Sequence, residues 1–329
     1  MPLVSPSRRV ETPQEFLADS TDRDGGSRGG HDNDPALWRE CGAPTVCVYA
    51  RAMPARRQRS TIAGRIDVTS MLLRDRRITV RIYVPADYEW SAREYPVLYM
   101  FDGHNLFDRT TSTYGKEWRV DETMQGLGEP AIVVGIDAPQ NRYERYAMYT
   151  VSDWEYRARS SGRLLKRIRG YGDETAAFLI EQVKPYVEAT YRAASDREQV
   201  GVAGSSMGGY MSLVVGTRYQ DRVSRVLAFS PVALDEPMRG FELREAIVGA
   251  GAPVAQRYYL DMGDRERLDY VRNPQELVDN LEGLRSALVH AGHRDVLARI
   301  VPGGRHDERA WARRFPEAYL WAFFGVELG

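Results

Sequence analysis

The chain has 329 residues, 43% of them hydrophobic and 28% charged, which is the composition of a globular protein with enough residues for a sizeable core. Its 45 lysines and arginines balance 46 acidic residues, so the net charge of −1 gives no reason to expect nucleic acid or an anionic membrane as a partner. Cys41 and Cys47 form no disulfide framework and match no common zinc spacing. No stretch resembles a signal peptide or a membrane span, which makes the cytoplasm the default compartment.

The beginning of the chain differs in composition from the rest. Residues 20–34 read STDRDGGSRGGHDND, a polar and glycine-rich tract with no apolar side chain to bury. We therefore expect a polar, partly flexible N-terminal extension over residues 1–60 and one domain over residues 61–329.

Strand and helix patterns alternate through the remainder of the chain. Residues 77–84 alternate apolar and polar side chains, as a half-buried strand does. Continuous apolar runs, typical of strands covered on both faces, occupy residues 97–101, 131–136, 200–203 and 226–229, with further strands expected at 257–260 and 296–301. Helical spacing appears in residues 173–190, 209–219 and 277–288. This order predicts an α/β fold with an antiparallel start, a mostly parallel central sheet and helices on both faces.

One short motif indicates chemistry. Residues 204–208 read GSSMG and fit GxSxG, in which a sharp turn between a strand and a helix exposes a serine hydroxyl. Ser206 follows the apolar run at 200–203 and precedes the helical pattern at 209–219. Residues 25–29 fit the same motif inside the polar tract, without a strand or a helix beside them. Ser206 is therefore the candidate nucleophile.

A serine nucleophile needs a base and an acid, which in this topology follow it in the order acid, then histidine. The chain contains His31, His104, His290, His293 and His306. The first two precede the serine, and His290 and His293 flank the end of a helix, where a surface histidine interacts favourably with the helix dipole. His306 follows the last expected strand and is the best base candidate. Spacing alone does not choose the acid among Asp261, Asp264, Glu266 and Asp269.

An oxyanion hole completes such a site. One donor is normally the backbone N–H of the residue after the nucleophile, here Met207. The other comes from the loop after an earlier central strand, and residues 102–108 read DGHNLFD there. The glycine lets the backbone turn its amides toward a substrate oxygen, with the His104 side chain as a wall of the pocket.

Six segments together resemble the putative-esterase family of α/β-hydrolases: residues 95–108, 134–145, 202–213, 228–234, 259–266 and 301–324. That family includes enterochelin (siderophore) esterases, esterase D or S-formylglutathione hydrolase, feruloyl esterases and mycolyltransferases. The resemblance covers residues 61–328 and implies an α/β-hydrolase fold with a Ser-acid-His triad and no cofactor or metal.

The resemblance also implies roles for individual residues. The nucleophile falls on Ser206, the histidine on His306 and the acid on Glu266, with Asp264 as the alternative. The second oxyanion donor falls on the backbone of His104. We expect a serine carboxylic-ester hydrolase; an acyltransferase of the same fold and a non-catalytic binding protein are the alternatives.

Specificity in such enzymes depends on loops, here residues 142–170 and 231–251, and Asn105 and Arg142 are candidate substrate-binding residues. Residues 157–170 carry six positive charges and no acid, and have no counterpart in the family pattern. They form either a solvated surface loop or a cationic rim that attracts an anionic ester, such as a siderophore, because arginine suits oxyanions. The expected partner is a small-molecule ester, and the sequence leaves the oligomeric state open.

Overall fold

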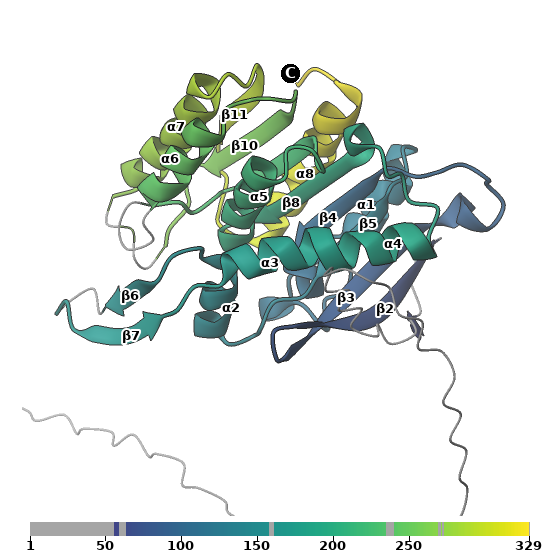
Figure 1. Ribbon diagram of the computed structural model, residues 1–329, viewed down its shortest axis with the longest axis horizontal. Coiled ribbons are helices and arrows are strands. Elements are labelled where there is room, and N and C mark those ends of the chain that lie inside the picture. The colour runs from purple at the N-terminus through teal and green to yellow at the C-terminus, as the bar shows by residue number, and fades with distance from the viewer. Residues whose placement is uncertain are drawn as a thin grey trace, which may run out of the picture. The chain divides into compact units, whose positions relative to one another are not determined.

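The computed structural model describes residues 56–58, 64–157, 161–234, 240–268, 271 and 273–328 (Figure 1). The described strands form a nine-stranded sheet in the order β1-β2-β3-β5-β4-β8-β9-β10-β11. Their bounds are β1 Arg56–Gln58, β2 Gly64–Leu73, β3 Arg76–Pro85, β4 Val97–Phe101, β5 Ile132–Ile136, β8 Val200–Ser205, β9 Arg225–Phe229, β10 Arg257–Gly263 and β11 Asp295–Val301. Pairing is antiparallel from β1 to β5 and parallel from β5 to β11, which confirms the predicted antiparallel start.

Helices cover both faces of the sheet. They are α1 Val120–Leu127, α2 Arg142–Tyr149, α3 Gly172–Phe178, α4 Lys184–Thr190, α5 Met207–Arg218, α6 Gly240–Ala250, α7 Gln275–His290 and α8 Glu308–Phe324. In Figure 1, α3, α4 and α5 lie in front of the sheet, whereas α8 lies behind it. Among the described helices, none combines the length and apolar character that crossing a bilayer requires.

Alternation along the strands creates two separate cores. In β4, Val97, Tyr99 and Phe101 pack into the larger core, on the side of helices α3 to α7. Leu98 and Met100 point the other way, into a smaller core with α1 and α8. All five side chains are buried because successive residues of a strand point to opposite faces and both faces are covered.

Three features differ from the sequence-based expectations. β2, which pairs with β3 over ten residue pairs, was not among the predicted strands. The helix expected over residues 173–190 contains a π-helical turn, Leu179–Val183, between α3 and α4. Part of the basic stretch forms an antiparallel hairpin of β6 Trp154–Arg157 and β7 Leu164–Ile168, which extends away from the main sheet in Figure 1. The expected N-terminal extension lies almost entirely outside the described residues.

The parallel strands bring their carboxyl ends to a single edge of the sheet. β4, β8, β9, β10 and β11 run in the same direction, so the loops that follow them meet at this edge. Open α/β sheets bind ligands there. The segments that carry Ser206, Glu266 and His306 all follow these strands.

Candidate active site

Ser206 lies in the sharp turn between β8 and α5. Its backbone has φ 57° and ψ −120°, a conformation that residues with a Cβ rarely adopt. The turn is tight: a Cβ on Gly204 would lie 2.5 Å from the carbonyl carbon of Gly208. The N–H of Ser206 donates to the Phe229 carbonyl (2.9 Å), and the Ser206 carbonyl accepts from the Val232 N–H (3.1 Å). These backbone bonds hold the strained serine in place.

His306, in the loop between β11 and α8, pairs with Glu266. Its Nδ1 is 2.7 Å from Glu266 Oε2, and Glu266 is only 1% exposed. Burial would raise the pKa of Glu266, but the hydrogen bond and charge of His306 lower it below its usual value. Because an ionised carboxylate only accepts, Nδ1 carries a hydrogen, and in the neutral imidazole Nε2 is the acceptor. Within the described part of the chain the Ser206 hydroxyl makes no hydrogen bond, so His306 is paired with its acid but not with the serine.

Glu266 is supported by a buried network that sequence reasoning missed. Its Oε1 accepts from the Ser230 hydroxyl (2.5 Å) and from the Gly263 N–H (2.7 Å). Ser230 Oγ in turn accepts from Trp311 Nε1 (2.8 Å) and Arg314 Nη2 (3.0 Å). The network therefore fixes the carboxylate from β9, β10 and α8 at once, and leaves Oε2 for His306.

A second buried carboxylate lies behind this network. Asp261, at 0% exposure, accepts from the Tyr259 hydroxyl (2.9 Å) and lies 3.1 Å from Arg314 Nε. Burial raises the pKa of Asp261 to about 6, although Arg314 and the Tyr259 hydroxyl act in the opposite direction. Asp261 is joined to Arg314 and not to His306.

The other acid and base candidates from the sequence lie elsewhere. Asp264 is exposed and accepts from the Gly303 N–H (2.7 Å), so it holds the turn after β11. The prediction of a surface position for His293 was wrong: it is 5% exposed and packs edge-on against Tyr258, with ring centroids 4.7 Å apart. His290 is exposed, as expected. Asp269, His31 and the second GxSxG match lie outside the described residues.

Two backbone N–H groups of the described chain are free to donate to a bound molecule. One lies beside the serine turn and the other in the loop after β4. The Met207 N–H begins α5, and the His104 N–H belongs to the 3-10 helix Gly103–Asn105. Among the hydrogen bonds of the described residues, neither N–H has an acceptor. The His104 side chain is 6% exposed, and its Nε2 lies 3.1 Å from Thr113 Oγ1.

An ion pair holds the loop after β4. Asp102 has a left-handed backbone (φ 58°), and both its carboxylate oxygens bind Arg145 of α2, each at 2.7 Å. Burial would raise the pKa of Asp102, but the charge and hydrogen bonds of Arg145 lower it. On the other side, a Cβ on Gly103 would lie 2.5 Å from the Gly135 carbonyl carbon, so only glycine fits there.

The two candidate substrate-binding residues occupy different surroundings. Asn105 is 7% exposed; its Oδ1 accepts from the Thr113 N–H (2.7 Å), and its Nδ2 lies 3.5 Å from Glu308 Oε1. Arg142 is exposed and lies over the rings of Tyr143 and Tyr156, 5.0 Å from each centroid. Asn105 therefore connects the loop after β4 to α8, whereas Arg142 joins helix α2 to the basic hairpin.

Glu308, in the first turn of α8, is a half-buried carboxyl near the loop of His306. Burial raises the pKa of Glu308 to about 7, with the negative charge of Asp102 adding to the effect and Lys116 opposing it. The sequence offered no signal for this residue, because its burial depends on packing between α8 and the loop after β4.

Comparison with known proteins places this arrangement in a family. A family model described as "Putative esterase" matches residues 70–322. Esterase MT1326 of Mycobacterium tuberculosis (strain CDC 1551 / Oshkosh) is 26% identical over 221 residues, which are 64% of this chain and 42% of that protein. The chain thus spans less than half of that relative.

Two solved structures share the fold. An IroE-like serine hydrolase from Shewanella oneidensis has a TM-score of 0.62 and 18% identity, covering 80% of this chain and 82% of that one. The enterobactin esterase FES from Shigella flexneri, solved in the presence of enterobactin, has a TM-score of 0.59 and 21% identity, covering 80% of this chain and 60% of that one. The fold is that of the α/β-hydrolases, as the sequence predicted.

Proposed function

The chain belongs to the family described as "Putative esterase" and is a carboxylic-ester hydrolase, and we propose that it works through a triad of Ser206, His306 and Glu266. One observation carries the proposal. The buried Glu266 carboxylate fixes His306 through Nδ1, at 2.7 Å, at the same sheet edge where Ser206 occupies a strained turn. A serine nucleophile needs a histidine base that is oriented by an acid, and Glu266 orients His306 in this way.

The proposed reaction begins with attack of Ser206 Oγ on the ester carbonyl carbon. His306 Nε2 takes the hydroxyl proton as the new C–O bond forms, and Glu266 stabilises the resulting imidazolium. When the carbonyl re-forms, the C–O bond to the alcohol breaks and His306 returns the proton to the leaving oxygen. A water molecule, deprotonated by His306, then attacks the acyl-enzyme, and collapse releases the acid and the serine.

The tetrahedral intermediates carry a negative charge on the former carbonyl oxygen. In our proposal the backbone N–H groups of His104 and Met207 donate to this oxygen, which explains why both lack an acceptor among the described residues. The Arg145–Asp102 pair keeps the His104 N–H in position before substrate arrives.

Replacement of Ser206 tests this function. Ser206→Ala is expected to lower kcat for a p-nitrophenyl ester by a factor on the order of a thousand or more, because only binding and the oxyanion donors remain. The adjacent, 6% exposed Ser205 is the matched control, and Ser205→Ala is expected to keep most of the activity. Wild-type rates in Ser206→Ala would contradict the proposal. Adding a competing alcohol separates hydrolysis from acyl transfer: we expect the free acid as the main product.

We further propose that the ester is anionic, with siderophore-like catecholates as one candidate class. The basic hairpin supports this idea. Arg157 and Arg167 pair with Glu155, but in the described part of the chain the side chains of Arg163, Lys166 and Arg169 have no ion pair. Unpaired cations on a protruding hairpin can attract an anionic substrate.

The hairpin packs on the helix that also contacts the oxyanion loop. Tyr146 of α2 lies 5.5 Å from Trp154 between ring centroids, and Arg142 donates to the Tyr156 hydroxyl (2.9 Å). Arg145 of the same helix binds Asp102. The positive charges are therefore connected to the catalytic edge through α2.

Neutralising the hairpin distinguishes an attractive rim from an ordinary solvated surface. The triple variant Arg163→Gln, Lys166→Gln, Arg169→Gln is expected to raise KM for an anionic ester several-fold and to leave KM for a neutral ester of similar size unchanged. Arg285→Gln, on the exposed side of α7, is the charge control. Equal effects on both esters would contradict the substrate proposal and leave the triad proposal untouched.

A further inference from the structure

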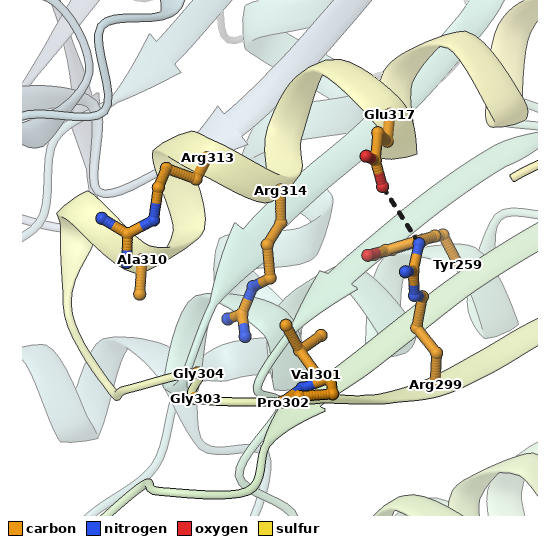
Figure 2. A pocket seen from close by; sticks show the side chains of 10 residues that line it. All are labelled: Tyr259, Arg299, Val301, Pro302, Gly303, Gly304, Ala310, Arg313, Arg314 and Glu317. Atoms are coloured by element: carbon orange, nitrogen blue, oxygen red, sulfur yellow. Dashed lines mark hydrogen bonds and ion pairs between the residues drawn. The ribbon is translucent and has the colours of Figure 1, made fainter. Parts of the chain in front are cut away.

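A cavity separate from the candidate active site lies between the end of β11 and helix α8. Its volume is about 250 Å³, and Figure 2 shows the ten residues around it. They are Tyr259, Arg299, Val301, Pro302, Gly303, Gly304, Ala310, Arg313, Arg314 and Glu317. None of the triad residues lines it. The function proposed above makes no use of this space.

Three arginines contribute to the lining, from two different elements. Arg299 comes from β11, whereas Arg313 and Arg314 come from α8 (Figure 2). Arg313 is exposed, and in the described part of the chain its side chain has no ion pair or hydrogen bond. Arg299 has one carboxylate partner, Glu317, at 3.1 Å. Two guanidinium groups at the mouth thus keep most of their donors available.

Arg314 forms the inner wall and is 7% exposed. Its Nη2 donates to Ser230 Oγ. Its Nε forms an ion pair with Asp261 at 3.1 Å, but neither Nε nor the buried Nη1 has a hydrogen-bond partner among the described residues. The nearest carboxylate oxygen to Nη1, on Glu266, is 3.8 Å away. A buried guanidinium N–H without an acceptor is costly and indicates a site for an acceptor that is not part of the chain.

Acidic groups lie beside the arginines of the cavity. Glu317 offsets Arg299, and Asp261 and Glu266 face Arg314 from the inside. Asp264 lies at the rim, where it accepts from the Gly303 N–H. Arg313 forms no ion pair in the described chain, but its charge helps to lower the pKa of Asp307. The ion pair of Arg299 is weakened by solvent, because Glu317 is 61% exposed.

The size and the donors together limit the ligand class. A volume of 250 Å³ is below the range of about 300–1,000 Å³ that holds drug-sized molecules, so the occupant is small. Guanidinium groups prefer an oxyanion that accepts several hydrogen bonds at once. A phosphate group meets both conditions, whether as inorganic phosphate or as the end of a small phosphomonoester.

We propose that this cavity is a phosphate-binding site, in which Arg299 and Arg313 bind the oxygens from the mouth and Arg314 forms the inner wall. The site is distinct from the ester-binding edge and does not depend on the proposed triad. Its occupant binds beside the arginine that supports Glu266 through Ser230.

Isothermal titration of the purified chain with sodium phosphate at fixed ionic strength tests the site. We expect saturable binding with one site per chain. Arg299→Gln and Arg313→Gln are each expected to weaken binding by about tenfold or more, because each removes a charged donor. Glu317→Gln is expected to tighten binding several-fold, because it frees Arg299. A second titration with glycerol 3-phosphate identifies the source: tighter binding than phosphate indicates an organic phosphomonoester, and weaker binding indicates inorganic phosphate.

The matched control is Arg309→Gln, which removes the same charge from the same helix at a residue that does not line the cavity. It is expected to change the affinity by less than about twofold at physiological ionic strength. Thermal unfolding of each variant verifies that it is folded. Absence of saturable binding, or equal binding by wild type and by the Arg299 and Arg313 variants, would overturn the proposal, as would an unchanged affinity in Glu317→Gln.

Discussion

Arg145 and Asp102 form a two-pronged ion pair, with both contacts at 2.7 Å, between helix α2 and the loop that carries the His104 N–H. Asp102 also has a left-handed backbone, which sets the direction of the chain into Gly103. The pair therefore connects α2, on which the basic hairpin packs, to the loop of the proposed oxyanion donor. We propose that Arg145 acts as a positioning residue through Asp102, without contact to substrate.

Loss of this ion pair is expected to lower kcat. In Arg145→Met, Asp102 would be left as a buried carboxylate without its cation, and the His104 N–H would lose its fixed direction. We expect a fall in kcat of about tenfold to a hundredfold with a smaller change in KM, measured with a p-nitrophenyl ester. Arg76→Met, which removes an exposed pair with Glu144 of the same helix, is the control and is expected to leave kcat unchanged. Equal effects of both substitutions would exclude a positioning role.

The identity of the acid is tested by a pair of substitutions. Glu266→Gln keeps the size of the side chain but favours the wrong imidazole tautomer, and we expect kcat/KM to fall by a factor of about a thousand or more. Asp264→Asn removes only the bond to the Gly303 N–H and is expected to reduce kcat/KM less than about fivefold. A larger loss in Asp264→Asn than in Glu266→Gln would reverse the assignment.

Ser230 is expected to matter for stability as well as for activity. Ser230→Ala would leave Trp311 Nε1 and Arg314 Nη2 each without a partner, and Glu266 Oε1 would keep only the bond from the Gly263 N–H. We expect the free energy of unfolding to fall by about 2 kcal/mol or more, measured by urea denaturation. Ser212→Ala, which removes a single bond to the Gly208 carbonyl, should cost about 1 kcal/mol. A smaller loss at Ser230 than at Ser212 would show that the network does not stabilise the fold.

Glu308 predicts a pH dependence of stability. Its pKa is raised from 4.5 to about 7 in the folded chain, so between these values the folded state holds a proton that the unfolded state has released. The contribution of Glu308 to the free energy of unfolding is therefore fully present below pH 4.5. It is lost as pH rises through 7, and the loss is at most about 3 kcal/mol. Glu308→Gln avoids this loss. We expect the variant to unfold at about the same urea concentration as wild type at pH 5 and at a higher one at pH 8; the same difference at both pH values would contradict the assignment.

The general architecture was readable from the sequence because periodicity reports burial directly. The run 97–101 matches β4 residue for residue, since a strand buried on both faces is apolar throughout. The order of serine, acid and histidine segments along parallel strands also indicated that they meet at one edge. Strand β2 was missed because two of its buried positions carry polar side chains, Asp67 and Thr69.

Other features depend on tertiary contacts that no local pattern contains. Ser230 meets Trp311 and Arg314 only because β9 and α8 pack together, more than 80 residues apart in the chain. The choice between Glu266 and Asp264 depends on how the turn after β10 directs each carboxylate. The burial of His293 against Tyr258 is likewise a property of the packed helix and sheet.

Mass spectrometry of the chain after reaction with a fluorophosphonate tests the central claim most directly, because the reagent bonds covalently to an activated serine. We expect one adduct per chain, located by peptide mapping on Ser206, lost in Ser206→Ala and retained in Ser205→Ala. An adduct that persists in Ser206→Ala, or that maps to another serine, would contradict the assignment of Ser206 as the nucleophile.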